Sequence, residues 1–269
     1  MPFFERFSAP IGASVREIDL TNLSKEDISL INRALVDHLV LFFHDQSLTP
    51  ESLNRLGQQF GAPAPYPYVE GLTGYPEVVE VIKKPEDTVN FGGVWHSDTA
   101  YLAEPAKAAI LYGVEIPDQG GDTMFTNMYL VYESLSPGMQ RYLRGLHAVN
   151  DADNDAIAAT RPGGARKGLK AEHPVIRRHP ETGKPLLFVN RAHTTKFSGM
   201  THEESRDLLA FLFDRIEQPE FSCRFSWAPG SVAFWDNRAC QHYPINDYHG
   251  QQRRMLRISL AGDTPAGFS

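Results

Sequence analysis

The chain has 269 residues, 42% of them hydrophobic and 22% charged, which is typical of a globular protein that buries a large core in one domain. Its formal net charge of −7 argues against a protein that follows nucleic-acid phosphates, and its two cysteines are too few for a disulfide scaffold or a cysteine-built zinc site. No apolar run approaches the roughly 20 residues that cross a bilayer, and the N-terminus lacks a signal-peptide pattern, so we expect a single cytoplasmic domain over residues 1–269.

Two helices with a strand between them are predicted near the N-terminus. Ser24, with Asp27 three positions later, is typical of a helix start, and apolar side chains follow at helical spacing. The short apolar run 40–43 then predicts a strand. Thr49 and Pro50 combine an N-cap residue with a proline in the first turn, which predicts the second helix.

Beyond residue 75 the sequence is dominated by short apolar runs that turn signals separate. This pattern predicts many short strands, and two longer stretches, 128–146 and 202–216, are predicted to be helical. We therefore expect a mainly β fold with helical decoration (α+β), built as a double-stranded β-helix, or jelly-roll barrel. The predicted strands lie at 78–82, 108–114, 186–190, 221–227, 231–235 and 255–260.

An insert is expected in the barrel at about 147–185. Within it, residues 151–172 are polar, rich in charge and contain several glycines. Such a stretch is either a mobile surface loop or a lid over an active site, and the sequence leaves both interpretations open.

Two histidines and an aspartate are the strongest candidates for a metal site. His96 and Asp98 lie two apart, so on a strand both side chains would point to the same face. His242 would join them only if the fold returned the chain to its start, as an antiparallel barrel does. Two imidazoles and one carboxylate on one face of a metal are the ligands of non-haem Fe(II) oxygenases, although zinc hydrolases use similar sets. Most of the other histidines are expected at the surface or on helix faces.

Arginines downstream of His242 favour the oxygenase over the hydrolase. Arg253, Met255 and Arg257 would share one face of a predicted core strand. A guanidinium inside a barrel is costly unless it meets an anion, and a dicarboxylate docked on Arg253 would provide one. The alternative is an arginine on the outer face, in contact with solvent.

Several motifs occur together in a characteristic order, and this order resembles the taurine dioxygenase (TauD/TfdA) family of Fe(II)/2-oxoglutarate-dependent dioxygenases. The similarity extends from about residue 8 to about residue 265. The motifs are Phe-Gly at 60–61, His-x-Asp at 96–98, Gly-Gly-Asp-Thr at 120–123, Val-Asn-Arg-Ala-His-Thr-Thr at 189–195, Trp-Asp-Asn-Arg at 235–238, Gln-His-Tyr at 241–243 and Gln-x-Arg at 251–253.

The resemblance implies the chemistry and the roles of the site residues. His96, Asp98 and His242 correspond to the iron ligands. Thr123 and Arg253 correspond to the residues that hold the distal carboxylate of 2-oxoglutarate, and Arg257 to an arginine near the cosubstrate that can also contact an anionic substrate. The implied reaction uses Fe(II), 2-oxoglutarate and O2 to hydroxylate a C–H bond, with release of succinate and CO2. Desaturation, epoxidation or cyclisation by the same chemistry, and a non-catalytic jelly-roll module that binds metal or 2-oxoglutarate, remain as alternatives.

The expected substrate is a small organic acid other than taurine. In taurine-using relatives a histidine and an asparagine grip the substrate, and Tyr66 and Gly92 stand at the matching positions here. A carboxylate- or sulfonate-bearing molecule, aromatic or not, is expected instead. No nucleic-acid or membrane partner is expected, whereas a homodimer or homotetramer would match the habit of relatives. The expected substrate pocket comprises Tyr66, Tyr68, Thr99, Tyr101, His193 and Arg257.

Overall fold

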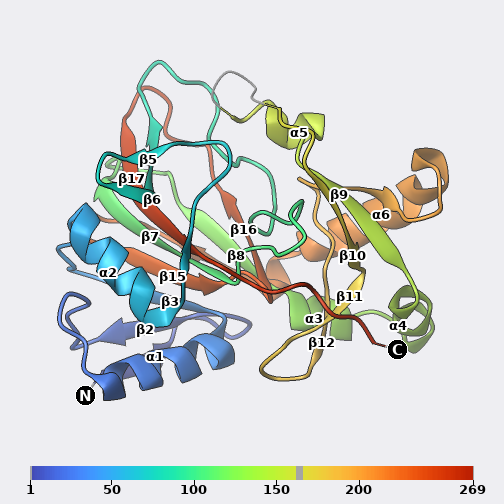
Figure 1. Cartoon of the computed structure of the whole chain (residues 1–269), viewed down its shortest axis with the longest axis horizontal. Helices are drawn as coiled ribbons and strands as arrows, with labels where there is room; N and C mark the ends of the chain where they lie inside the picture. The colour runs from blue at the N-terminus through green and yellow to red at the C-terminus, as the bar shows by residue number, and fades with distance from the viewer. Residues whose placement is uncertain (1, 162–165, 269) are drawn as a thin grey trace.

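A nine-stranded sheet forms one wall of the molecule (Figure 1). The computed structural model describes residues 2–161 and 166–268. The strand order is β1-β2-β3-β15-β7-β17-β6-β5, with β4 also paired to β17, and all neighbours are antiparallel except β2 and β3. The strands are β1 (Phe3–Arg6), β2 (Ala13–Arg16), β3 (Val40–Phe43), β4 (Pro63–Ala64), β5 (Gly71–Leu72), β6 (Tyr75–Lys83), β7 (Ala108–Glu115), β15 (Val232–Asp236) and β17 (Arg253–Leu260).

A second sheet of three strands faces the large one and closes a barrel. It has the order β14 (Ser222–Phe225), β8 (Thr123–Asn127) and β16 (Cys240–Pro244). Aromatic rings fill the space between the sheets: the rings of Phe42 and Phe225 stack with centroids 4.2 Å apart, and Phe125 lies 5.8 Å from Trp235. The expected jelly-roll architecture with helical decoration is confirmed.

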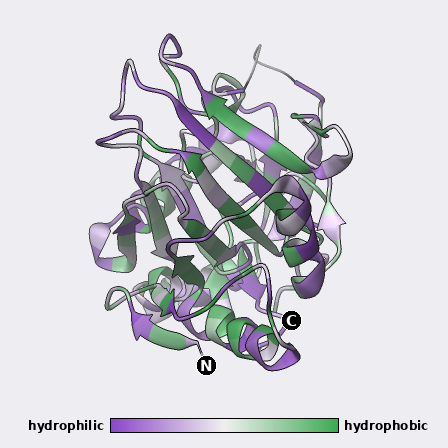
Figure 2. Ribbon diagram, turned by 90° about the vertical axis from the view of Figure 1, so that its left-hand side faces the viewer, coloured by the Kyte–Doolittle hydropathy of each residue, from purple (hydrophilic) through white to green (hydrophobic). Residues whose placement is uncertain are grey.

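Two helices, α1 (Lys25–His38) and α2 (Pro50–Phe60), cover the outer face of the large sheet. Both predicted starts are confirmed, since Ser24 and Thr49 each accept a hydrogen bond from the backbone N–H three positions on. Side chains alternate along β3, so that Leu41 and Phe43 pack under the helices while Phe42 enters the barrel. Figure 2 shows the result, with hydrophobic residues concentrated on the inner strands and hydrophilic ones on loops and outer helix surfaces.

The remaining elements lie on the side of the barrel away from α1 and α2 (Figure 1). The part of the chain that the structure describes has no helix long and apolar enough to cross a membrane. The elements on this side of the barrel are α3 (Met128–Glu133), α4 (Pro137–Arg144), β9 (His147–Asp151), α5 (Asp155–Ala158), β10 (Lys170–Pro174), β11 (Ile176–Arg178), β12 (Pro185–Leu187), β13 (Thr194–Phe197), α6 (His202–Ile216) and the 3₁₀ turn η2 (Pro219–Phe221).

Three predicted elements need correction. The helix expected over 128–146 is two helices, because Ser136 caps a new helix that Pro137 begins. The strand expected at 186–190 ends at Leu187, and the one expected at 221–227 begins after a 3₁₀ turn. The polar stretch 151–172 contains the short helix α5, and its residues 162–165 lie outside the described part of the chain.

Candidate active site

Direct backbone pairing brings His96 and His242 together, although more than half of the chain lies between them. The N–H of His96 donates to the carbonyl of His242 (3.1 Å), and the N–H of His242 donates to the carbonyl of His96 (3.0 Å). His242 lies on β16, but His96 forms only this isolated bridge. The expectation that His96 and Asp98 share a regular strand is therefore wrong. A turn follows His96, and Thr99 within it has a left-handed backbone with a φ of 52°.

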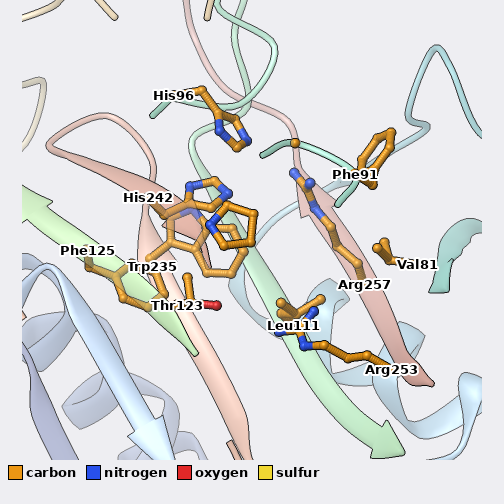
Figure 3. Close-up of a pocket in the computed structure, with 12 residues that line it drawn as sticks. Val81, Phe91, His96, Leu111, Thr123, Phe125, Trp235, His242, Arg253 and Arg257 are labelled. Atoms are coloured by element: carbon orange, nitrogen blue, oxygen red, sulfur yellow. The ribbon is translucent and has the colours of Figure 1, made fainter. Parts of the chain in front are cut away.

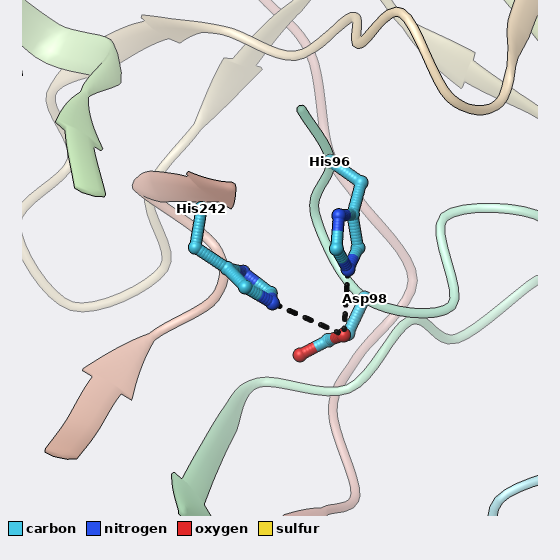
Figure 4. Close-up of side chains that lie close together, drawn as sticks. All are labelled: His96, Asp98 and His242. Carbon is cyan, nitrogen blue, oxygen red and sulfur yellow. Dashed lines mark ion pairs between the residues drawn. The ribbon is translucent and has the colours of Figure 1, made fainter. Parts of the chain in front are cut away.

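The three side chains nevertheless converge (Figure 4). Oδ1 of Asp98 lies 3.6 Å from Nε2 of His96 and 3.9 Å from Nε2 of His242, and the three donor atoms lie within 4.8 Å of one another. All three residues are buried. Nδ1 of His96 hydrogen-bonds the carbonyl of Val94 (2.6 Å), which turns Nε2 toward the other two residues. Metal–ligand bonds of roughly 2 Å fit inside this group, so its spacing and donor types suit a bound Fe(II).

The surroundings keep the donor atoms in the states that bind a metal. Burial alone would raise the pKa of Asp98, but the guanidinium of Arg257, with Nη2 2.7 Å from Oδ2, outweighs it and lowers the pKa. Burial, together with the neighbouring His96, lowers the pKa of His242 well below its ordinary value. An ionised carboxylate and a neutral imidazole are the forms that coordinate metals.

Asn237 holds Asp98 in place, and the sequence analysis did not assign it a role. Its Oδ1 accepts the backbone N–H of Asp98 (2.7 Å), and its Nδ2 donates to the carbonyls of Asp98 (3.1 Å) and Ala106 (2.7 Å). Because Asn237 follows β15 directly, these bonds fasten the turn with Asp98 to the strand that precedes β16. The Trp-Asp-Asn-Arg motif was the only available signal for this residue, and it gave no indication of the contact.

A hollow of about 490 Å³, here called the Arg253 chamber, opens on one side of the metal-binding group (Figure 3). The two histidines lie at one end and Arg253 at the other. As predicted, Arg253, Met255 and Arg257 share the inner face of β17. The chamber is lined by Val81, Phe91, Gly92, His96, Leu111, Thr123, Phe125, Trp235, His242, Pro244, Arg253 and Arg257.

Arg253 is suited to hold an anion. Its residue is only 6% exposed, it forms no ion pair with any described carboxylate, and its Nε and Nη2 have no hydrogen-bond partner among the described residues. Thr123 lies in the same chamber, where its Oγ1 accepts a hydrogen bond from Nε1 of Trp227 (2.9 Å) and keeps its own proton to donate. A dicarboxylate of the size of 2-oxoglutarate fits this arrangement, with one end at Arg253 and the other at the metal ligands.

A smaller hollow of about 270 Å³, the Arg161 chamber, adjoins the Arg253 chamber, since Phe91, Gly92 and His96 line both. It is reached by Asp98 but not by His242, whereas His96 lines both chambers. The metal-binding group therefore stands at the junction of two compartments. This second chamber is lined by Tyr66, Phe91, Gly92, His96, Asp98, Thr99, Ile157, Thr160, Arg161 and His193.

The residues predicted for the substrate pocket fall into three groups. Tyr66, Thr99 and His193 line the Arg161 chamber. The Thr99 hydroxyl, however, accepts the N–H of Ala106 (2.9 Å) and so supports the turn. Tyr68 and Tyr101 lie one layer behind, where Tyr101 packs edge-on against both Tyr68 (5.8 Å) and His193 (4.9 Å).

Arg257 forms the third group, because it lines the Arg253 chamber and forms an ion pair with Asp98. Arg161 was missed by the sequence analysis. The only hint of it in the sequence was its position at the edge of a glycine-rich insert.

Two histidines expected at the surface are buried. His173 is 2% exposed, and its Nε2 bonds the carbonyl of Leu102 (3.0 Å). His179 is 1% exposed, and its Nε2 lies 3.0 Å from Oδ2 of Asp236. Neither belongs to the metal-binding group.

A jelly-roll barrel with a buried His-x-Asp…His group, beside a buried guanidinium that has no carboxylate partner among the described residues, defines the class of 2-oxoglutarate-dependent oxygenases. The family model "Taurine catabolism dioxygenase TauD, TfdA family" matches residues 4–259, so the chain belongs to this family. It is accordingly an oxidoreductase that uses Fe(II), 2-oxoglutarate and O2, as the motifs predicted.

Curated relatives and solved structures cover nearly the whole chain. It is 31% identical to an alkylsulfatase of Acinetobacter baylyi over 97% of this chain and 86% of the relative. An alpha-ketoglutarate-dependent sulfate ester dioxygenase of Pseudomonas putida is also 31% identical, over 96% of this chain and 88% of the relative. The crystal structure of a taurine dioxygenase from Burkholderia xenovorans superposes with a TM-score of 0.87 at 36% identity, over 99% of this chain and 93% of that one.

Proposed function

We propose that this chain hydroxylates a C–H bond of a small organic anion, with release of succinate and CO2. The observation that carries the proposal is the position of the His96–Asp98–His242 group where two adjoining chambers meet. One chamber offers Arg253 for a dicarboxylate cosubstrate, and the other, which Asp98 lines, would receive the substrate beside the metal ligands. Fe(II) held by the three ligands would supply the activation of O2.

The protein's own residues position the reactants and protect the site. Arg253 and Thr123 would bind the far carboxylate of 2-oxoglutarate and so direct its other end toward His96 and His242. Arg257 keeps Asp98 ionised. The rings of Phe125 and Trp235 pack against the ring of His242, at centroid distances of 6.1 and 4.8 Å, and exclude water from that side.

Sulfate esters and sulfonates are the substrate class that we favour. Two relatives with 31% identity carry names for chemistry on sulfate esters. Taurine itself fits poorly, because Tyr66 and Gly92 replace the residues that grip it. Gly92 has a φ of 71°, and a Cβ there would lie 3.1 Å from Cε1 of His96, so this position favours glycine and offers no side chain to an amine.

Turnover of a substrate panel tests the proposal. Purified protein would be supplied with Fe(II), 2-oxoglutarate and O2, and then with alkyl sulfates, alkyl and aryl sulfonates, aryloxy acids, taurine or neutral alcohols. We expect substrate-dependent succinate with an anionic compound. With an alkyl sulfate, hydroxylation next to the ester oxygen gives an unstable product that separates into an aldehyde and sulfate. Activity restricted to neutral or cationic compounds would contradict the proposal.

The same assay distinguishes the alternatives. Hydroxylation adds one oxygen to the product mass, whereas desaturation and cyclisation remove two hydrogens. Epoxidation also adds one oxygen but needs a double bond, so a saturated substrate separates it from hydroxylation. A zinc hydrolase or a non-catalytic binding module would produce no succinate. Loss of succinate formation in the His96→Ala variant would locate the activity at this site.

We further propose that residues 1–269 act as a single domain and that the insert at 147–185 forms one wall of the substrate compartment. Thr160 and Arg161, which line the Arg161 chamber, support this role. A cytoplasmic location and assembly into a dimer or tetramer also remain predictions. Light scattering after size-exclusion chromatography tests the assembly.

A further inference from the structure

Lys83 places a second buried positive charge beside Arg253. Lys83 is the last residue of β6 and Arg253 the first of β17, and the two stand directly opposite each other in this antiparallel pair. Side chains of directly opposite residues leave the sheet on the same face. Val81, two residues before Lys83, lines the Arg253 chamber, so this face is the inner one (Figure 3).

No described hydrogen-bond partner meets the charged ends of this pair. Lys83 is 4% exposed, and its Nζ is buried without a hydrogen-bond partner among the residues that the structure describes. Nε and Nη2 of Arg253 are in the same situation. Neither side chain forms an ion pair with a described carboxylate. Like charges that stand side by side destabilise each other, and burial adds to this cost, so this end of the chamber favours a bound anion.

The carboxylates that influence the pair are engaged elsewhere. Burial lowers the pKa of Lys83, and Asp87 raises it only in part. Asp87 is exposed, and its Oδ2 accepts a backbone N–H of its own turn (2.8 Å). Burial also lowers the pKa of Arg253, an effect that Asp122 partly offsets, but Oδ2 of Asp122 accepts a hydrogen bond from Nε of Arg224 (2.5 Å). The two cations therefore keep charge for a ligand.

The ring of Tyr248 holds Lys83 at this position. Nζ lies 4.1 Å from the ring centroid, where the electron-rich face attracts a cation. The phenol donates to Oδ1 of Asn90 (2.8 Å), whose Nδ2 donates to two backbone carbonyls at the end of β16 and just after it (3.3 and 2.9 Å). A Cβ placed on Gly121 would lie 3.2 Å from Cδ1 of Tyr248 and 3.3 Å from Cδ of Arg253, so the ring also borders the arginine.

We propose that Lys83 is a specificity residue for the cosubstrate, whose charge adds to that of Arg253 and strengthens binding of the far carboxylate of 2-oxoglutarate. Arg253 lines the chamber, whereas Lys83 stands beside it and acts through its electric field, which extends over several ångström where little water screens it. The result is a preference for 2-oxo acids that end in a second carboxylate. This inference rests on the proposed role of Arg253 and is independent of the substrate.

Cosubstrate binding without turnover tests the inference. 2-Oxoglutarate, or 2-oxopentanoate, which has the same chelating end but no far carboxylate, would be titrated calorimetrically into protein that holds Mn(II) in the absence of oxygen. Lys83→Met keeps an unbranched side chain and removes the charge. We expect it to weaken binding of 2-oxoglutarate roughly 5- to 50-fold and to leave binding of 2-oxopentanoate unchanged. Lys83→Arg, which keeps the charge, should retain most of the affinity.

Three controls separate charge recognition from general damage. Lys84→Met removes the charge of the exposed neighbour and should bind both acids as the wild type does. Arg253→Met should lose more affinity for 2-oxoglutarate than Lys83→Met, because it removes the group that lines the chamber. Without cosubstrate, Lys83→Met should melt at the temperature of the wild type or above it, since Arg253 then loses a neighbour of like charge.

Each outcome decides for or against Lys83. Equal affinity for 2-oxoglutarate in the wild type and Lys83→Met would overturn its role. A parallel loss of affinity for both acids, or a lower melting temperature of Lys83→Met, would also overturn it, because the lysine would then support the fold. Failure of the proposed function would instead appear as protein that binds 2-oxoglutarate but forms no succinate with any anionic substrate.

Discussion

Asn237 connects two parts of the candidate active site through its amide group. Its side chain hydrogen-bonds the backbone N–H and carbonyl of Asp98 and also the carbonyl of Ala106, and the residue is 1% exposed. No other side-chain type of similar size offers an acceptor and two donors in this arrangement. The position of the Asp98 carboxylate therefore depends on a residue that does not itself touch the metal.

Replacement of Asn237 by alanine should weaken metal binding. We expect a loss of roughly 10- to 100-fold in affinity for Mn(II), as is typical when support of a ligand is removed, and a loss of about 1–3 kcal/mol in the free energy of unfolding. Metal titration and urea denaturation measure the two effects. Asn32→Ala, on the exposed side of α1, is the matched control and should change neither. Unchanged Mn(II) affinity in Asn237→Ala would remove Asn237 from this role.

The two cysteine thiols should be unreactive in the folded protein. Burial raises the pKa of Cys223 to about 12 and that of Cys240 well above its ordinary value. Both thiols therefore stay protonated at pH 8, where a free cysteine with a pKa of about 8.5 is partly ionised and reactive. We expect mass spectrometry to detect no iodoacetamide adduct on native protein at pH 8 and two adducts in denaturant. Rapid alkylation of the native protein would contradict the burial of these thiols.

At the scale of the elements, a buried charge cluster fastens the turn between β15 and β16. Asp236 accepts hydrogen bonds from Arg238 (2.8 and 2.7 Å) and lies 3.0 Å from Nε2 of His179. Arg238 also reaches Glu181 at 2.7 Å. Because His179 and Glu181 belong to the connection between β11 and β12, the cluster ties this connection to the turn that leads into β16, the strand that carries His242.

Removal of the charge at Asp236 should destabilise the fold. Asp236→Asn leaves the buried guanidinium of Arg238 without its main partner, and we expect a loss of about 3–5 kcal/mol in the free energy of unfolding. Asp207→Asn, which removes an exposed partner of Arg206, is the control and should cost about 0–1 kcal/mol. Urea unfolding at pH 7 measures both variants, and equal losses would contradict the importance of burial.

The contribution of Asp236 to the free energy of unfolding should also depend on pH. Burial would raise its pKa, but the hydrogen bonds from Arg238 and His179 outweigh this effect and lower it. Because the folded pKa lies below the unfolded value of about 3.9, the contribution is present above pH 4 and is lost as the pH falls further. Urea unfolding between pH 7 and pH 3 should show that the free energy of unfolding falls more steeply in the wild type than in Asp236→Asn. Parallel curves would contradict this assignment.

At the scale of the whole molecule, the metal-binding group joins the two ends of the barrel sequence. His96 precedes β7, and His242 lies on β16, so the donor atoms meet only when the barrel is closed. A metal that binds the folded chain and not the unfolded one stabilises the fold by mass action. Metal binding and folding should therefore be coupled in this protein.

Mn(II) in the absence of oxygen should raise the melting temperature. At a free concentration of 100 times its Kd, the ion should stabilise the folded protein by about 2.7 kcal/mol, and a chelator should reverse the effect. His242→Ala should show no such shift, whereas His44→Ala, an exposed histidine after β3, should behave as the wild type. Differential scanning calorimetry provides the measurement. An equal shift in His242→Ala would place the metal elsewhere.

Much of the fold and the types of the ligands could be predicted from the sequence. The capping residues Ser24 and Thr49, the strand at 40–43 and the shared face of Arg253 and Arg257 all depend on residues a few positions apart, whose spacing the sequence displays directly. The nature of the donors, two imidazoles and a carboxylate, likewise needs no coordinates.

Only the tertiary structure decided how these donors meet. Asp98 reaches the metal group through a turn that Asn237, 139 residues further along the chain, holds by hydrogen bonds, and Thr160, next to Arg161, is bonded to Gly92. Such contacts join segments whose spacing along the chain has no period, so no local pattern reveals them. They form because a closed barrel leaves each buried polar group only the partners that its neighbours in space provide.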